Sequence, residues 1–276
     1  MSERQPDRYA VVGNPIGHSK SPRIHALFAQ ATGREMSYEA LPAPLLGFAD
    51  TVSRFRDAGG RGLNVTVPFK QEAWAWVDEL TPRARLAGAV NTIAFRPDGS
   101  ALGDNTDGVG LVRDLSANLG LTLESRRLLL LGAGGAARGV LGPLLDQHPQ
   151  LVIIANRTEP RAQALAADFA ARGPVTACAF RDLGETCDLV LNATSAGLHG
   201  EVPPVPSSVV GADTCCYDMV YSDQPTAFVR WARPLGARLA VDGLGMLVEQ
   251  AAESFRLWRG VMPDTAPVIA ALRPQS

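Results

Sequence analysis

The segment that decides the fold is RRLLLLGAGGAARGVLGPLL, residues 126–145. An unbroken apolar run leads into a glycine-rich turn, and a helical pattern of small and apolar residues follows. The turn matches GxGxxA between a strand and a helix, which is where dinucleotide-binding domains place it. In that pattern Gly132 permits a tight turn, Gly134 lets the backbone approach a pyrophosphate, and Ala137 keeps the helix close to the strand.

The helix after the turn gives an electrostatic reason to expect a dinucleotide. Its first turn offers unpaired backbone N–H groups and a partial positive charge, and both favour phosphate. A tight turn in an α/β domain with no ligand would contain the same glycines. The position of the turn, after a strand and at the start of a helix, favours the dinucleotide.

The rest of the second half alternates strands with a helix, and its strands are continuous apolar runs. Such runs are typical of a parallel sheet covered on both faces. We predict a helix over 161–173, a long amphipathic helix over 245–260, and strands within 150–158, 187–197, 213–221 and 236–243.

The end of the strand at 150–158 bears on the choice of cofactor. NAD-binding domains usually have Asp or Glu there to hold the ribose 2′-hydroxyl. Here the tip reads Asn156, Arg157 and Thr158, with Arg161 a few residues on. A guanidinium suits a 2′-phosphate because it is planar and permanently charged. We therefore expect NADP(H), although Thr158 could equally be the N-cap of the next helix.

The first half alternates in the same way, so we predict a second α/β domain with a parallel sheet. The expected strands are 8–13, 36–42 and 61–68, with helices over 21–33 and 45–59. Ser21 is the expected N-cap of the first helix and Gly33 follows its end.

Composition and charge exclude several classes of protein. The chain has 276 residues, of which 46% are hydrophobic and 20% charged, with a net charge of −2. This balance argues against nucleic acid or an anionic membrane as partner. The first residues lack the apolar core of a signal peptide, and no apolar run approaches the roughly 18 residues of a membrane span. The four cysteines form no CxxC pair, so we expect no metal site and a reducing, cytoplasmic setting.

Polar residues gather near the predicted strand ends in four short stretches: 17–22, 64–70, 88–92 and 103–108. Taken singly, each is explained by helix capping or turn formation. Taken together, they supply neutral hydroxyl and amide groups where open α/β sheets bind ligands. Such groups suit a small polyhydroxylated substrate.

Within 64–70 the residue types alternate, so Asn64 and Thr66 are expected on one face of the strand and Val65 and Val67 on the other. Lys70 follows, one of only two lysines among 26 basic residues. Reduction of a carbonyl generates an alkoxide that needs a proton, which lysine can supply and arginine cannot. Asp107 would orient the amine. A solvated lysine at the start of a helix is the alternative, and spacing alone does not decide.

Nine motifs together resemble the shikimate dehydrogenase family, in the same order along the whole chain. They are GNPIGHSKSP (13–22), GLNVTVPFK (62–70), LAGAVNTI (86–93), DNTDG (104–108), LGAGGAARG (131–139), ANRT (155–158), NATSAGL (192–198), YDMVY (217–221) and DGLGMLVEQA (242–251).

The resemblance implies roles for individual residues. Lys70 would be the acid/base and Asp107 its partner. Groups that bind the substrate or orient Lys70 would be Ser19, Ser21, Asn64, Thr66, Asn91, Asp107, Tyr221 and Gln250, with the two serines on the carboxylate. Cofactor contacts would come from Gly132, Ala133, Gly134, Gly135 and Ala136 at the pyrophosphate, Asn156, Arg157 and Thr158 at the 2′-phosphate, and Thr194, Met219, Gly243 and Met246 towards the nicotinamide.

The resemblance also implies an activity and a domain plan. The activity would be the reversible, NADPH-dependent reduction of 3-dehydroshikimate to shikimate, a step of aromatic amino-acid biosynthesis. Residues 1–106 and 242–276 would form the substrate-binding domain and 107–241 a Rossmann NADP-binding domain, with the active site between them and the last helix returning to the first. A quinate/shikimate dehydrogenase that uses NAD and a non-catalytic ligand-sensing regulator are the alternatives. The oligomeric state, a homodimer included, is open.

Overall fold

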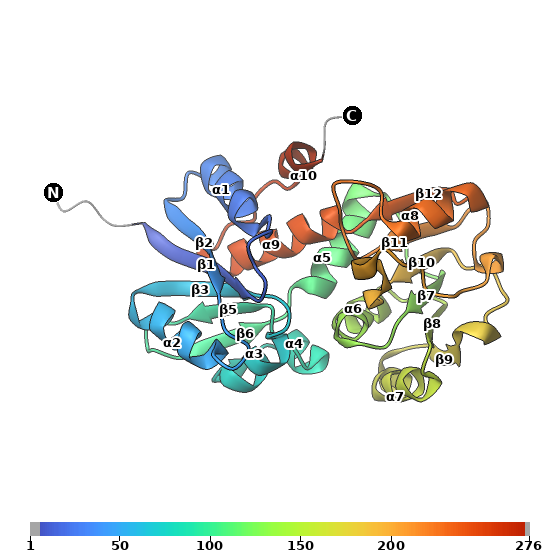
Figure 1. Cartoon of the computed structure of the whole chain (residues 1–276), viewed down its shortest axis with the longest axis horizontal. Helices are drawn as coiled ribbons and strands as arrows, with labels where there is room; N and C mark the ends of the chain where they lie inside the picture. Colours follow the sequence, from blue (N-terminus) through green and yellow to red (C-terminus); the bar gives the residue numbers. More distant parts are fainter. Residues whose placement is uncertain (1–5, 274–276) are drawn as a thin grey trace. The chain divides into compact units, whose positions relative to one another are not determined.

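The computed structural model describes residues 6–273, which form two compact α/β units, each built on a six-stranded sheet (Figure 1). The first unit contains the described residues up to Gly110 together with Val248–Leu272, and the second contains Leu111–Leu247. The long C-terminal helix α9 (Leu244–Arg259) therefore brings most of its length back to the first unit.

The first sheet has the strand order β2-β1-β3-β5-β6-β4. Its strands are β1 (Asp7–Gly13), β2 (Met36–Pro42), β3 (Gly60–Val65), β4 (Glu79–Leu80), β5 (Thr92–Phe95) and β6 (Ala101–Asp104). The pairs of β1 with β2 and β3 are parallel, as predicted, but β5 runs antiparallel to both β3 and β6. The prediction of a parallel sheet is wrong for this part because a tight turn, in which Arg96 N–H donates to Ser100 O at 2.9 Å, makes β5 and β6 a hairpin.

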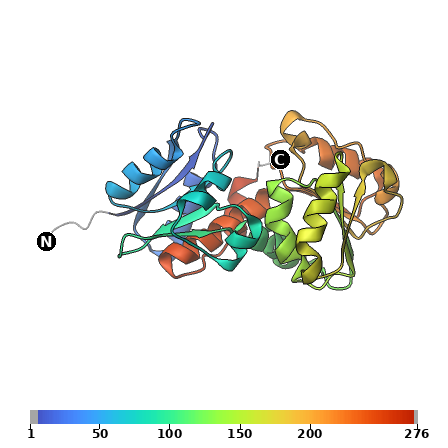
Figure 2. The ribbon, with the colours of Figure 1, turned by 90° about the horizontal axis from the view of Figure 1, so that it is seen from below.

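Helices cover both faces of this sheet. They are α1 (Ser21–Thr32), α2 (Phe48–Asp57), α3 (Lys70–Trp76), α4 (Pro82–Ala87), α5 (Asp107–Arg113), which runs on into the second unit, α9, and α10 (Ala266–Leu272). Figures 1 and 2 show α2 and α9 on opposite faces. Leu63 and Val65 of β3 pack in the core with Phe48 of α2, whereas Asn64 between them bonds Ser254 of α9. The period of two along a strand thus sends Asn64 to the face opposite Val65, as predicted.

Two predicted boundaries are wrong. Ser21 is the first residue of α1, not its N-cap, because the Ser19 hydroxyl accepts the Ser21 N–H at 3.2 Å and Lys20 becomes the cap. Strand β3 ends at Val65, so Thr66 lies beyond the ladder. A turn in which Phe69 N–H donates to Thr66 O at 3.0 Å leads directly into α3, which starts at Lys70.

The second sheet is wholly parallel, as the apolar runs predict, with the order β12-β11-β10-β7-β8-β9. Its strands are β7 (Arg127–Leu131), β8 (Leu151–Asn156), β9 (Val175–Ala179), β10 (Leu189–Asn192), β11 (Cys215–Asp218) and β12 (Leu239–Asp242). Strand β9 was not predicted. Helices α6 (Gly135–Leu145) and α7 (Glu159–Phe169) lie side by side (Figure 2), and α8 (Ala227–Ala232) precedes β12.

The four cysteines are free, and Cys187, Cys215 and Cys216 are buried. Among residues 6–273, no helix is long and apolar enough to cross a bilayer. Over the same described part of the chain, no cluster of three or more His, Cys, Asp or Glu side chains is arranged to hold a metal ion.

Candidate active site and cofactor site

Lys70 and Asp107 form a close ion pair at the starts of two helices of the first unit. Lys70 Nζ lies 2.6 Å from Asp107 Oδ2, and the two side chains are 30% and 16% exposed. The pair is therefore partly shielded but reachable by a ligand. The backbone reinforces the placement, because Val90 N–H donates to Lys70 O at 2.9 Å.

Asn91 holds the other oxygen of Asp107. Its Nδ2 lies 2.8 Å from Asp107 Oδ1, 2.9 Å from Thr106 Oγ1 and 3.3 Å from Gln250 Oε1. Its Oδ1 accepts the Thr106 N–H at 2.8 Å. Asn91 is 2% exposed, so its amide is a buried junction that fixes Asp107 against the turn and against α9.

Asn64 is also almost fully engaged within the protein. Its Nδ2 lies 2.9 Å from Ser254 Oγ and 3.1 Å from Thr92 Oγ1. Its Oδ1 accepts the Tyr38 hydroxyl at 2.7 Å and lies 3.2 Å from His25 Nε2. Asn64 is only 6% exposed, so its side chain is a buried link between these hydrogen-bond partners.

His25 and Tyr38 belong to this cluster, although no pattern in the sequence connects them with it. Their rings stack with centroids 4.2 Å apart, and His25 is completely buried. Because Asn64 turns its amide nitrogen towards acceptors, its Oδ1 faces His25, whose Nε2 must carry the hydrogen. The His25 Nδ1 has no hydrogen-bond partner among the described residues, which fits this neutral tautomer.

His25 makes the stability of the fold depend on pH. Burial lowers the pKa of His25 from 6.5 to about 3, against the raising effect of its bond to Asn64. As the pH falls below 6.5, His25 becomes protonated in the unfolded chain but stays neutral in the folded chain. The free energy of unfolding therefore falls between pH 6.5 and pH 3, by up to about 5 kcal/mol. We predict that His25→Gln flattens this part of the curve when free energies of unfolding are measured against pH. If the free energies of unfolding of variant and wild type changed in parallel with pH, His25 would not be the source of this pH dependence.

The two serines and Thr66 complete the predicted substrate set in the first unit. Ser21 is 7% exposed, and its side chain forms a hydrogen bond with Tyr38. Burial raises the pKa of Tyr38 well above its usual value, and the bond to Ser21 opposes this effect. Ser19 is half-buried, and its hydroxyl accepts the Ser21 N–H described above. Thr66 is anchored by its backbone, whose N–H donates to Val12 O at 3.0 Å.

The glycine turn of the second unit has the form that a dinucleotide needs. Gly132 has φ 105°, and a Cβ there would lie 3.1 Å from Ala193 O, so both conformation and space require glycine. A Cβ at Gly134 or Gly135 would meet no atom within 4 Å, so the backbone faces open space where α6 begins. Ala137 is fully buried, which keeps the helix against the sheet.

The end of β8 presents the residues predicted for the 2′-phosphate. Asn156 Nδ2 donates to Thr158 O at 2.9 Å, and Thr158 is the N-cap residue of α7 without a side-chain capping bond. The hydroxyl of Thr158 is therefore not used by the helix. Arg157 and Arg161 are exposed, and neither forms an ion pair within residues 6–273.

The remaining cofactor candidates lie at the carboxyl ends of the neighbouring strands. The Thr194 hydroxyl donates to Asn192 Oδ1 at 2.7 Å, and Thr194 Cγ2 would lie 3.3 Å from a Cβ on Gly132. A Cβ on Gly243 would lie 2.5 Å from Met219 O, so the two segments are in direct contact. The structure thus brings these candidates to one edge of the second sheet.

Met246 and Tyr221 are the other two predicted site residues of this unit. Met246 is 7% exposed and its N–H donates to the Tyr217 hydroxyl at 3.3 Å. Tyr221 follows β11, and burial, with a smaller contribution from the charge of Asp223, raises the pKa of its hydroxyl, so Tyr221 stays neutral.

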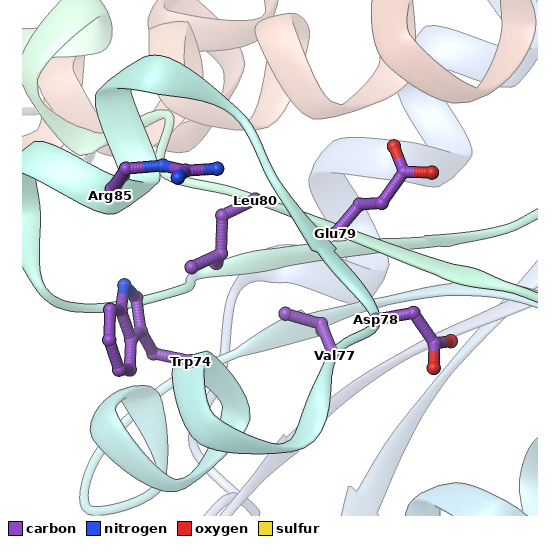
Figure 3. Close-up of a pocket in the computed structure, with 6 residues that line it drawn as sticks. All are labelled: Trp74, Val77, Asp78, Glu79, Leu80 and Arg85. Atoms are coloured by element: carbon purple, nitrogen blue, oxygen red, sulfur yellow. The ribbon is translucent and has the colours of Figure 1, made fainter.

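The first unit also contains a surface hollow of about 500 Å³ that includes no predicted site residue (Figure 3). Its lining is Trp74, Val77, Asp78, Glu79, Leu80 and Arg85. Its two carboxylates are already used: Asp78 accepts the Ala101 N–H at 2.7 Å, and Glu79 pairs with Arg96 at 2.8 Å. The hollow is distinct from the Lys70–Asp107 cluster.

Models of three protein-domain families match successive parts of the chain. The shikimate dehydrogenase substrate-binding domain matches residues 11–93, shikimate/quinate 5-dehydrogenase matches 114–199, and the shikimate 5-dehydrogenase C-terminal domain matches 243–273. The matched segments lie in both units.

Individual relatives agree over nearly the full length. The chain is 61% identical to the shikimate dehydrogenase (NADP(+)) of Thioalkalivibrio sulfidiphilus, with 97% of this chain and 98% of that protein covered. Shikimate 5-dehydrogenase from Thermus thermophilus, solved with NADP(H) and shikimate, is 37% identical with a TM-score of 0.86, covering 96% and 98%. Quinate dehydrogenase from Corynebacterium glutamicum with NAD is 28% identical with a TM-score of 0.85, covering 97% and 98%. The chain therefore belongs to the shikimate dehydrogenase family.

Proposed function

We propose that the protein is an NADP-dependent shikimate dehydrogenase in which Lys70 exchanges the proton and Asp107 holds Lys70 in place. The observation that carries this proposal is the 2.6 Å contact between Lys70 Nζ and Asp107 Oδ2, set in a cluster of amide and hydroxyl groups. The proposal places the substrate on the first unit and the cofactor on the second. The free cysteines suit a reducing compartment, so we place the protein in the cytoplasm.

Lys70 can act in both directions of the reaction. As an ammonium group it donates a proton to the oxygen of the ring ketone, and as a neutral amine it accepts a proton from the ring hydroxyl. Asp107 keeps the amine oriented through one carboxylate oxygen while Asn91 holds the other. Arginine could not replace Lys70 because its guanidinium stays protonated.

The neighbouring polar groups suit a cyclohexene carboxylate that carries several hydroxyls. Ser19 and Ser21 would hold its carboxylate, and Thr66, Asn64 and Gln250 would meet its hydroxyls. Because Asn64 is already bonded on both sides of its amide, it is preorganised and loses little freedom when a ligand binds. Asn91 would act mainly through Asp107.

The second unit fits NADP(H). Open backbone at Gly134 and Gly135 leaves room for a pyrophosphate at the start of α6, and the exposed Arg157 and Arg161 offer charge to a 2′-phosphate. When bound, the reduced nicotinamide supplies the hydride for the ring ketone. The contacts of Gly243 with Met219 and of Gly132 with Thr194 would shape the wall along the cofactor.

The substrate assignment is tested by initial rates with shikimate and with quinate, each in the presence of NADP⁺ and of NAD⁺. We expect shikimate with NADP⁺ to give by far the highest kcat/KM. A preference for quinate would identify a quinate dehydrogenase of the same fold, and a preference for NAD⁺ would contradict the assignment of Arg157.

A further inference from the structure

Arg83 of α4 joins two buried carboxylates that come from distant parts of the sequence. Its Nε lies 2.7 Å from Asp104 Oδ1 at the end of β6, and its Nη2 also contacts Asp104 Oδ2. Its Nη1 and Nη2 each lie 3.0 Å from Glu253 Oε1 on α9. Asp104 and Glu253 are only 1% and 3% exposed.

The other partners leave Arg83 as the link between the two carboxylates. Asp104 also accepts the Thr81 hydroxyl at 2.6 Å and the Asn105 N–H at 2.8 Å, both neutral donors. Glu253 also accepts two hydrogen bonds from Arg256, one from Nη2 to Oε1 at 2.6 Å and one from Nε to Oε2 at 3.0 Å. Within residues 6–273, Arg83 is the cation that hydrogen-bonds Asp104, and its guanidinium joins the Asp104 carboxylate to the Glu253 carboxylate of α9.

The two carboxylates sit beside the groups that hold the Lys70–Asp107 pair. Asp104 opens the turn that ends in Asp107, and its own O accepts the Asn91 N–H at 3.0 Å. Glu253 lies three residues after Gln250, on the same side of the helix. Asp107 and Gln250 both bond Asn91 Nδ2, so the two elements that Arg83 joins also meet at that amide.

We propose that Arg83 is a positioning residue for the Lys70–Asp107 pair, acting through the two buried carboxylates that it joins. Without Arg83, Asp104 would be a buried carboxylate with no cationic partner, next to a second one on α9. The strand end and the helix would then move apart, and the Asn91 amide could no longer hold Asp107 and Gln250 together. Misplacement of a catalytic group by about 1 Å can cost about 100-fold in rate. This inference rests on the proposed role of Lys70 and Asp107.

A purely structural salt bridge is the competing explanation, and kinetics distinguish the two. If Arg83 only stabilised the fold, Arg83→Met would lower the melting temperature while the folded molecules kept their kcat. If Arg83 positions the pair, kcat per folded molecule falls while KM for NADPH, set by the second unit, stays unchanged. Arg83→Lys loses the planar fork but keeps one charge between the carboxylates, so it should restore part of the rate.

The experiment measures kcat and both KM values well below the melting temperature of each variant. We expect Arg83→Met to lower kcat about 10- to 100-fold, Arg83→Lys to stay within about 5-fold of the wild type, and Arg96→Met to leave kcat unchanged. Arg96→Met is the matched control because it breaks an exposed arginine–carboxylate pair, Arg96–Glu79, in the same unit. If Arg83→Met does not fold, Glu253→Gln is measured in its place. Glu253→Gln weakens the bond between Arg83 and α9 but leaves Asp104 paired with Arg83, and we expect its kcat to fall as well.

Asp107→Asn is measured in parallel to separate this inference from the proposed function. A large loss of kcat in Asp107→Asn with normal kcat in Arg83→Met would overturn the positioning role and leave the proposed function intact. Normal kcat in both would overturn the proposed role of Asp107, and with it this inference, while the dehydrogenase activity itself would stand. Equal losses in Arg83→Met and Arg83→Lys would also overturn the inference, because the bridging charge would then have no effect.

Discussion

Lys70→Ala is expected to lower kcat for shikimate oxidation by about 100-fold or more, which is the usual contribution of a general acid or base. The loss falls on kcat more than on KM, because proton transfer stabilises the transition state and contributes little to the binding of the ground state. The contact of 2.6 Å between Lys70 Nζ and Asp107 Oδ2 places the amine where Asp107 can orient it. Steady-state rates over a range of shikimate concentrations separate the two constants.

Lys70→Arg is the matched variant for this prediction. It keeps the positive charge beside Asp107 but removes the group that can give and take a proton. We expect its kcat to stay close to that of Lys70→Ala. A near-normal kcat in Lys70→Arg would mean that only the charge matters, and the proton-transfer role would be wrong.

Arg157→Ala is expected to raise KM for NADPH by about 10- to 100-fold, the range that corresponds to the roughly 1.5–3 kcal/mol of a hydrogen bond to a charged group. KM for NADH should hardly change, because NADH has no 2′-phosphate. Arg157 is exposed at the tip of β8 and has no ion-pair partner among the described residues, so its charge is available to the cofactor. Kinetics with both cofactors give the ratio directly.

Arg172→Ala is the control for the change in charge. Arg172 is another partly exposed arginine of the second unit, paired with Asp146 at 2.7 Å, and lies outside the predicted cofactor set. Its substitution should leave the preference for NADPH unchanged. If both variants lose the preference equally, the effect is one of net charge and Arg157 has no specific contact with the phosphate.

Much of the fold was predictable because its signals are local. The apolar run before Gly132 and the glycines after it determine a strand, a turn and a helix within about twenty residues, and the structure has β7 and α6 there. The alternation around Asn64 likewise predicted which side chain leaves the core. Strands β5 and β6 were missed because each has only four residues and borders a motif whose polar residues are typical of turns: β5 begins at the last residue of GAVNT, and β6 ends in the first two residues of GDNTDG.

The support of the site could not be predicted because its contacts are distant in sequence. His25 lies 39 residues from Asn64, and Arg83 lies 170 residues from Glu253. No local period connects such positions, and a lone histidine or arginine on a helix is usually structural or solvent-exposed. The motifs around Lys70 and Asp107 indicated the proposed chemistry, whereas the three-dimensional packing of α1, α4 and α9 was needed to find the residues that contact this cluster.

The most direct test of the proposed function is the oxidation of NADPH by purified protein in the presence of 3-dehydroshikimate, followed by absorbance, with NADH and with no substrate as controls. We predict oxidation of NADPH that depends on 3-dehydroshikimate, is far slower with NADH and is slower by about 100-fold or more in Lys70→Ala. No oxidation of NADPH by the folded protein would contradict the proposed function and would favour a protein that binds the ligand without converting it.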